Sequence, residues 1–227
     1  MHLRVCVPIM ERTELRALRA IDRLESQDPD LLEIRLDLLN GTSSIAKIRK
    51  ATDRSIVATN RRRGEGGFFS GREETRLQTL NQAAKAGFDY VDVELNTKNV
   101  SKFVDRLKSD GAQAIVSHHD QTTTPDLAVL ESILEKTKKA GADVSKIVTT
   151  AKSYEDSLRS LVFVNKHAKK TKLVCFAMGR LGIPSRVLSP IYGACFTFAS
   201  SGFGRETAPG QIPISSLRTL YEEFQIL

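Results

Sequence analysis

The sequence predicts an α/β fold of one domain, a (β/α)8 TIM barrel. Short apolar runs alternate with segments of helical spacing along all 227 residues, and strict alternation of this kind is typical of a parallel sheet covered by helices. Eight such runs start about 27 residues apart, so eight strand–helix units account for about 220 residues. This is a compact form of a fold that typically takes about 250 residues. A doubly wound open sheet is the second possibility.

The predicted elements follow one another as strand, helix, strand. The strands are the short apolar runs at residues 3–9, 31–39, 55–59, 90–95, 114–117, 146–150, 173–177 and 194–199. The helices are the segments of helical period at residues 11–24, 73–86, 100–107, 127–139, 154–167 and 215–224. Gly87, Gly111 and Gly141 each stand between a helix and the next strand, where a left-handed residue commonly ends a helix. No linker or low-complexity tract interrupts the pattern, so we expect one domain over residues 1–227.

Composition and charge narrow the class of protein. The chain is 41% hydrophobic and 27% charged, which is typical of a globular protein. Its formal charge of +7 leaves nucleic acid, anionic membranes and acidic small molecules as candidate partners. With no Trp and 6% aromatic residues, side chains that stack on single-stranded nucleic acid are scarce. No apolar run approaches the roughly 20 residues that span a bilayer. Three cysteines without a Cys-x-x-Cys pair favour a reducing, cytoplasmic setting.

The second and fourth predicted strands alternate between charged and apolar residues. Glu33 and Arg35 share one face of the second strand, and Asp92 and Glu94 share one face of the fourth. Both faces of a strand in a parallel barrel are covered, so the apolar faces meet the helices and the charged faces point inward. Lys146 belongs to the inward set of the sixth strand. Because buried charges are costly unless paired, we interpret this interior as a polar site, with structural ion pairs as the alternative.

Two features of this interior can carry chemistry. A desolvated lysine amine is a nucleophile for carbonyl groups, although Lys146 could also be a solvated side chain at the entry end of its strand. His118, His119 and Asp120 follow the fifth strand, at the end where catalytic groups of barrels collect. Neighbouring strand residues face opposite ways, so at most one histidine joins the interior, and spacing alone does not decide which one. For the same reason these residues make a weak metal site.

Two loops could close over a ligand. Residues 61–67 read Arg-Arg-Arg-Gly-Glu-Gly-Gly, a basic and glycine-rich segment that lacks the Gly-Lys-Ser/Thr of a phosphate-binding loop. Residues 200–211 contain Gly202, Gly204, Pro209 and Gly210, as a hinged lid would. The alternatives are a plain flexible loop and an ordinary turn before the last helix.

These motifs resemble those of the type I 3-dehydroquinate dehydratases, the Schiff-base class, in the short archaeal-like form. The resemblance covers essentially the whole chain, because seven motifs occur in the family's order: Glu33-Ile-Arg35-Leu-Asp37, Arg61 with Glu65-Gly-Gly, Asp92-Val-Glu94, Ser117-His118-His119-Asp120, Lys146-Ile, Met178-Gly with Ser185-Arg186, and Ala208-Pro-Gly-Gln211-Ile. It implies a barrel that needs no metal or organic cofactor. It also implies a hydro-lyase that converts 3-dehydroquinate to 3-dehydroshikimate in the shikimate route to aromatic amino acids. Family members are commonly homodimers, and the apolar tail at residues 224–227 could contribute to such a contact.

The resemblance also assigns roles to individual residues. Lys146 matches the Schiff-base lysine, and His119 matches the catalytic histidine because the family's histidine directly precedes Asp. Glu65 aligns with a carboxylate that assists the histidine. The residues matched to substrate binding are Arg186 and Gln211 at the carboxylate, Glu33, Arg35 and Arg61 around the ring hydroxyls and the mouth, and Thr207, where members often carry Ser.

This residue set suits the elimination. An iminium formed by Lys146 at the substrate ketone acts as an electron sink, so the adjacent proton can leave to a base. His119 can take that proton and donate it to the departing hydroxyl on the same face, which makes a syn dehydration. The nearest alternative is a Schiff-base aldolase on the same barrel, which has no need for the grip of Arg186 and Gln211. A basic nucleic-acid-binding protein is the other, although its basic residues are interleaved with acids along the helices.

Overall fold

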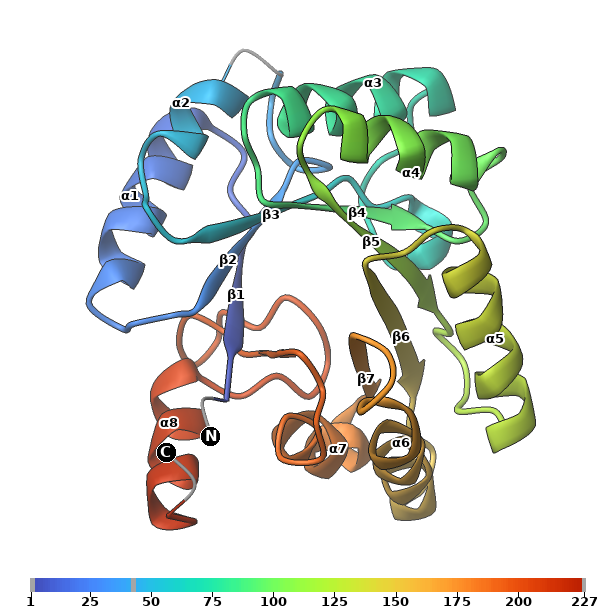
Figure 1. Ribbon diagram of the computed structural model, residues 1–227. Helices are drawn as coiled ribbons and strands as arrows, with labels where there is room; N and C mark the ends of the chain where they lie inside the picture. Colours follow the sequence, from blue (N-terminus) through green and yellow to red (C-terminus); the bar gives the residue numbers. More distant parts are fainter. Residues whose placement is uncertain (1–2, 42–43, 226–227) are drawn as a thin grey trace.

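The fold is one parallel eight-stranded sheet wrapped into a barrel (Figure 1). The computed structural model describes residues 3–41 and 44–225. The strands are β1 (Val5–Ile9), β2 (Leu31–Arg35), β3 (Ser55–Thr59), β4 (Tyr90–Glu94), β5 (Gln113–His119), β6 (Val144–Thr150), β7 (Leu173–Met178) and β8 (Thr197–Phe198). Their spatial order is β7-β6-β5-β4-β3-β2-β1-β8, which has no reversal. The barrel is therefore confirmed, and the doubly wound open sheet was the wrong alternative.

The barrel closes through a short seam. β8 has two residues and pairs with β1, where Thr197 lies opposite Val5. On the other side, the Cys195 N–H donates to the Leu173 carbonyl of β7 over 2.8 Å. Within residues 3–41 and 44–225, β7 and β8 share no ladder of paired residues. We refer to this junction between β7 and β8 as the seam.

The helices lie outside the sheet. They are α1 (Glu14–Glu25), α2 (Ile45–Arg49), α3 (Glu73–Lys85), α4 (Val100–Ser109), α5 (Leu127–Lys139), α6 (Tyr154–His167), α7 (Ile183–Leu188) and α8 (Ile214–Glu223). The short helices α2 and α7 were not predicted, because neither is long enough to show a helical period. The single turns η1 (Arg63–Glu65) and η2 (Arg180–Gly182) were not predicted either.

Local signals explain where the helices begin and end. α1 starts three residues later than predicted because the Thr13 hydroxyl accepts the Arg16 N–H, which makes Thr13 the cap. A capping box formed by Ser153 and Asp156 starts α6. The three glycines predicted to end helices all have φ between +87° and +92°, so that prediction is confirmed.

The predicted strand faces are also confirmed. Ile34, Val91 and Val93 pack in the apolar layer between the sheet and the helices, and Ile147 packs in a second such cluster. Val148 instead belongs to the cluster inside the barrel. β2 ends at Arg35 rather than at residue 39, and β6 starts at Val144 rather than at residue 146. The earlier start of β6 matters most, because it moves residue 146 from the strand's entry into its interior.

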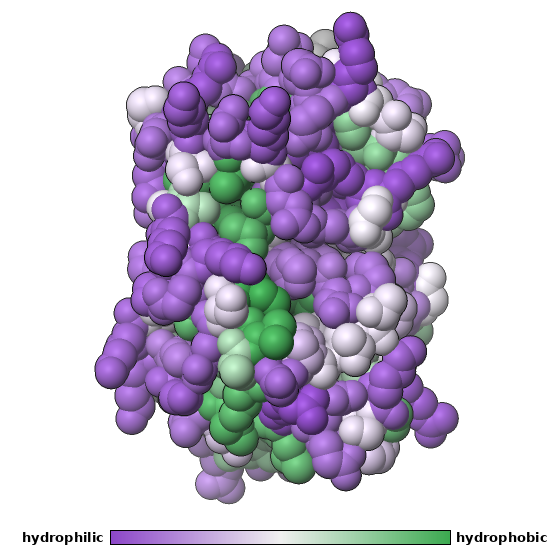
Figure 2. Space-filling view, turned by 90° about the vertical axis from the view of Figure 1, so that its right-hand side faces the viewer, coloured by the Kyte–Doolittle hydropathy of each residue, from purple (hydrophilic) through white to green (hydrophobic). Residues whose placement is uncertain are grey.

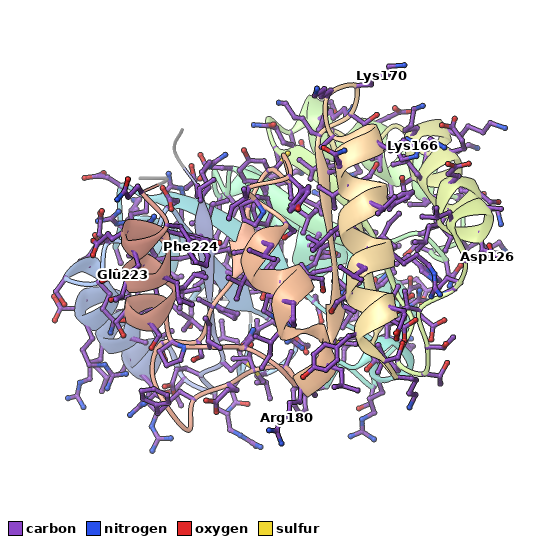
Figure 3. The ribbon with its side chains drawn as sticks, turned by 90° about the horizontal axis from the view of Figure 1, so that it is seen from below. Asp126, Lys166, Lys170, Arg180, Glu223 and Phe224 are labelled. Carbon is purple, nitrogen blue, oxygen red and sulfur yellow. The ribbon has the colours of Figure 1, made fainter. Side chains whose placement is uncertain are left out.

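Figure 3 shows which end of the barrel holds the strand termini. Arg180 follows β7 and Lys170 follows α6, and the two lie at opposite edges of that view. The edge with Arg180 is therefore the carboxyl end of the strands. α7 lies between α6 and α8 in both Figure 1 and Figure 3, where it covers the seam. None of the helices in the described ranges is long and apolar enough to cross a membrane.

Candidate active site

Lys146 lies inside the barrel. It is the third residue of β6 and only 5% exposed, so the alternative of a solvated lysine at the strand entry was wrong. Its Nζ is 2.9 Å from Asp92 Oδ2 and 3.7 Å from Glu33 Oε1. The ring of Phe198 from β8 lies against the amine, with its centroid 4.4 Å from Nζ. The amine is thus held by two carboxylates and one aromatic face.

Asp92 of β4 is the centre of a charged network that includes side chains from β5, β6 and the segment after β3. It accepts hydrogen bonds from Lys146 and from the Ser117 hydroxyl, over 2.9 and 2.6 Å, and Arg61 Nη2 lies 2.8 Å from it. Burial favours protonation of Asp92, but Arg61 and Lys146 outweigh this effect and hold its pKa below the usual range. Arg61 also donates to Ser117 over 2.7 Å. The Arg61 side chain is 4% exposed and lies in the interior of the barrel.

His119 and Glu65 face each other beside this network. His119 Nδ1 lies 3.3 Å from Glu65 Oε2, and both side chains are 10% exposed. Burial, Arg61 and Lys146 hold the pKa of His119 well below its usual value, so its imidazole is neutral near pH 7. His119 shares the inward parity of Ile115 and Ser117, and Ile115 packs inside the barrel. His118 belongs to the opposite parity.

The environment of Glu65 leads to a prediction about stability. Burial raises its pKa from 4.5 to about 7, although Arg61 partly opposes this, and its Oε1 has no hydrogen-bond partner among the described residues. Below pH 4.5 the carboxyl is protonated in both the folded and the unfolded protein, so it does not affect the free energy of unfolding. Between pH 4.5 and pH 7 it ionises more readily in the unfolded protein, so the free energy of unfolding falls as the pH rises. We therefore expect Glu65→Gln to be more stable than the unsubstituted protein by up to about 3 kcal/mol above pH 7.

Thermal unfolding at pH 4.5, 6 and 8 measures this effect. The melting temperature of Glu65→Gln should exceed that of the unsubstituted protein by up to about 10 °C at pH 8, with little difference at pH 4.5. Glu135→Gln is the matched control, because the Glu135 side chain is 57% exposed. A pH-independent difference for Glu65→Gln would contradict the explanation.

Arg186 is a buried cation on α7. Its exposure is 2%, and its guanidinium lies over the Phe176 ring at 4.2 Å. Its Nη2 donates to the Pro209 carbonyl over 3.2 Å, whereas its Nε has no partner among the described residues. Burial lowers its pKa to about 9. The ion pairs within the described ranges include no carboxylate for Arg186, so this side chain is suited to an external anion.

The backbone around Arg186 explains its position. The Arg186 carbonyl accepts the Thr197 hydroxyl of β8 over 2.7 Å, and the Ser185 hydroxyl accepts the Ala177 N–H of β7 over 2.9 Å. α7 is thereby fixed to both sides of the seam. A Cβ at Gly182 would lie 2.3 Å from the Ala177 carbonyl oxygen, so the chain can turn closely into α7 only with glycine there.

The loop between β8 and α8 brings Thr207 and Gln211 to the same cavity. The Gln211 Oε1 accepts the Thr207 N–H over 2.8 Å, and its Nε2 donates to the Thr207 hydroxyl over 2.9 Å. Gly210 has φ +79°, and a Cβ there would lie 2.4 Å from the Gly179 carbonyl oxygen. This close approach ties the loop to the turn that follows β7, on the side where Arg186 lies.

Glu33 and Arg35 of β2 complete the predicted set. Glu33 Oε1 accepts the Thr59 hydroxyl over 2.7 Å, and Arg35 pairs with Asp37 over 2.6 Å. A cavity of about 120 Å³ collects all nine predicted site residues, namely Glu33, Arg35, Arg61, Glu65, His119, Lys146, Arg186, Thr207 and Gln211. No group of three or more metal-ligating side chains occurs in the part of the chain that the structure describes.

Two contributors to the site were not singled out in the sequence. Ser117 joins Arg61 to Asp92, and its inward parity with Ile115 was the available signal. Arg76 of α3 is fully buried and binds Glu94 and, over 2.9 Å, Thr97. Glu94 therefore takes part in a structural ion pair, which was the alternative interpretation of the inward charges. It does not line the cavity. Nothing in the helical pattern of residues 73–86 marked Arg76 as buried.

The fold and this cavity together define a (β/α)8-barrel enzyme with its polar site at the carboxyl ends of the strands. A family model described as type I 3-dehydroquinase matches residues 5–227, and the chain belongs to that family. The family resemblance in the sequence is therefore confirmed. It favours the dehydratase over the aldolase and over the nucleic-acid-binding protein.

Individual relatives agree with this assignment. A 3-dehydroquinate dehydratase from Dehalococcoides mccartyi is 35% identical over 217 residues, which is 96% of this chain and 94% of the relative. One from Methanothermobacter thermautotrophicus is 33% identical over 225 residues, 98% of each chain. The crystal structure of 3-dehydroquinate dehydratase from Geobacillus kaustophilus has a TM-score of 0.92 at 26% identity, covering 99% of this chain and 92% of that one.

Proposed function

We propose that this chain dehydrates 3-dehydroquinate to 3-dehydroshikimate in the shikimate pathway, through an iminium formed on Lys146. One observation carries the proposal: the buried Lys146 amine lines the same cavity as the buried Arg186, which pairs with no carboxylate among the residues that the structure describes. The substrate has a ketone and a carboxylate, so one group can meet each cation. Neither an aldehyde without a carboxylate nor a nucleic acid would require both.

The first half of the reaction forms the iminium. The Lys146 ammonium passes a proton to the neutral His119 imidazole, and the free amine attacks the ketone carbon. His119 returns this proton to the ketone oxygen, which gives the carbinolamine, and takes a second proton from the attacking nitrogen. It passes that proton to the new hydroxyl, which leaves as water while the nitrogen electron pair forms the iminium. Asp92, 2.9 Å from Nζ, remains ionised throughout and stabilises the positive charge on the iminium nitrogen.

The second half expels the hydroxyl. Neutral His119 takes the proton from the carbon beside the iminium, and the electron pair moves to the nitrogen to give an enamine. The pair then returns and expels the hydroxyl, which leaves as water with the proton from His119. Hydrolysis of the conjugated iminium releases the product and restores Lys146. Glu65, 3.3 Å from Nδ1, orients the imidazole for both transfers.

Arg186 gives a prediction about substrate binding. It can hold the carboxylate through two N–H groups, with Gln211 and Thr207 beside it, so Arg186→Gln should raise KM for 3-dehydroquinate by about 10²-fold. Steady-state assays that follow the conjugated enone absorbance measure this. Arg180→Gln is the control, because the Arg180 side chain is exposed and points away from the molecule in Figure 3.

A contrary result would change the assignment of the carboxylate site. An Arg186→Gln enzyme with unchanged KM would show that another group holds the carboxylate.

We infer that the enzyme is a homodimer and that α6 forms the contact. Tyr154, Leu158 and Val162 lie four residues apart on α6 and are 58%, 61% and 53% exposed. The side of the molecule on which α5 lies carries an apolar band in an otherwise hydrophilic surface (Figure 2). The first turn of α6 is acidic and its last turn is basic, so two antiparallel copies related by a two-fold axis complement each other in charge.

Light scattering tests the dimer. Leu158→Glu should halve the molar mass, whereas Leu15→Glu on α1, where Leu15 is 58% exposed, should leave it unchanged. A monomeric unsubstituted protein would contradict the inference. The predicted tail contribution includes residues 226 and 227, which lie outside the described residues; Phe224 is 48% exposed.

We also propose a cytoplasmic location and one catalytic domain over residues 1–227. Cys6, Cys175 and Cys195 are free thiols, as is usual in a reducing compartment, and the family model spans residues 5–227.

A further inference from the structure

A second, larger hollow lies between α1 and the β8–α8 loop, which are neighbours in Figure 1. Its volume is about 440 Å³. The floor is apolar and largely buried, with Ile9, Ala20 and Leu24 at 3%, 7% and 3% exposure. Arg23 and Arg205 stand on its rim. The volume lies in the range of sites for small organic molecules.

An adjoining hollow of about 280 Å³ extends the basic rim. It is lined by Glu11, Arg16, Arg19, Arg23 and Arg205. The three arginines of α1 are spaced three and four residues apart and so share one face of the helix. All four arginines are exposed. We call these four side chains the arginine rim.

The arginine rim carries more positive charge than the carboxylates around it balance. Like charges at this helical spacing repel each other. Of the three acids of α1, Glu14 is 3.1 Å from Lys47 and Glu25 is 2.8 Å from Arg54, whereas Asp22 lines neither hollow. Within the described ranges, none of the four arginines takes part in an ion pair. The carboxylates that line the hollows are Glu11 and Glu206, so four cations face two anions. The surplus favours an anionic ligand.

We propose that the two hollows form a binding site for a phosphorylated organic molecule of about nucleotide size. A guanidinium group can donate two parallel hydrogen bonds to the oxygens of one phosphate. The arginine rim offers four guanidinium groups on one side of an apolar floor. The phosphate groups would lie between Arg23 and Arg205, and the organic part would cover Ile9 and Leu24. The established family activity needs no such ligand.

The site is connected to the catalytic cavity by shared residues. Pro8 and Thr207 line both cavities, and Thr207 is hydrogen-bonded to Gln211. The loop already touches the turn that follows α1, where Gln27 Nε2 donates to the Ser201 carbonyl over 3.4 Å. An anion that bridges Arg23 and Arg205 would add a second tie and restrain the loop that carries Thr207. Binding should therefore slow amide hydrogen exchange across residues 201–211 and change KM.

Calorimetric titration with ATP at about 0.15 M salt tests the proposal. We expect dissociation constants below about 1 mM for ATP, with weaker binding of both adenosine and inorganic tripolyphosphate. Arg23→Gln with Arg205→Gln should weaken ATP binding at least about tenfold. Arg106→Gln, an exposed arginine on α4, is the matched control.

Absence of ATP binding at about 1 mM would overturn the proposal, and so would equal binding by the double variant. Tripolyphosphate binding as tightly as ATP would refute the role of the apolar floor. ATP binding should persist in Arg186→Gln, and its loss there would place the ATP in the catalytic cavity instead. Because binding is measured without turnover, failure of this site leaves the proposed dehydration untouched, and the reverse also holds.

Discussion

Lys146→Ala should abolish covalent trapping and reduce kcat by on the order of 10⁵-fold, because the covalent route through the iminium disappears and only positioning remains. Borohydride added with 3-dehydroquinate reduces the iminium of the unsubstituted enzyme. Mass spectrometry should then find a substrate-sized addition on the peptide that contains Lys146. The variant should show no addition under the same conditions.

The controls separate chemistry from folding. Lys146 is one of two cations on Asp92, and Arg61 remains 2.8 Å from that carboxylate in the variant, so the network keeps a counter-charge. The melting temperature of the variant checks this point. Lys138→Ala is the matched control, because the Lys138 side chain is 44% exposed. An unmodified enzyme that stays active after borohydride and substrate would rule out the iminium mechanism, whatever the variants do.

His119→Ala should lower kcat by about 10² to 10⁴-fold, the range that general acid–base catalysis contributes. Each of the proton transfers in the proposed cycle passes through this imidazole, and its depressed pKa keeps it in the base form at neutral pH. Stopped-flow absorbance and borohydride trapping together should show slower iminium formation as well as slower elimination.

His118 supplies the comparison from the adjacent position. It has the opposite parity on β5 and does not line the cavity, so His118→Ala should keep kcat within about threefold of the unsubstituted enzyme. Loss of activity in His118→Ala, with His119→Ala unaffected, would reverse the assignment.

Period-2 alternation was enough to predict which residues enter the barrel. Glu33, Asp92 and Lys146 are all buried inside the barrel, because the apolar residues that alternate with them pack against the helices. The pairing among them was not predictable, because it depends on the register between strands. Ser117 meets Asp92 only because β5 is aligned so that Ser117 lies beside Glu94 and Lys146. A single sequence carries no direct signal for that alignment.

Short elements account for the remaining differences. α7 has six residues and follows a glycine turn, so no period could reveal it, although it carries Arg186. β8 has two residues, because Thr197 and Phe198 alone pair with β1, whereas the apolar run spans residues 194–199. The nine site residues come together as the resemblance implied; their individual roles rest on the experiments proposed above.

Two aromatic rings of the site, Phe176 and Phe198, also pack against each other across the seam between β7 and β8. Phe176 of β7 and Phe198 of β8 meet edge to face across it, with ring centroids 6.1 Å apart. Phe198 also lies against Lys146, and Phe176 lies against Arg186. The side chains that flank the two cations therefore also join the barrel where backbone pairing is sparse. A substitution of either ring would therefore change both the surroundings of a cation and the packing that closes the barrel.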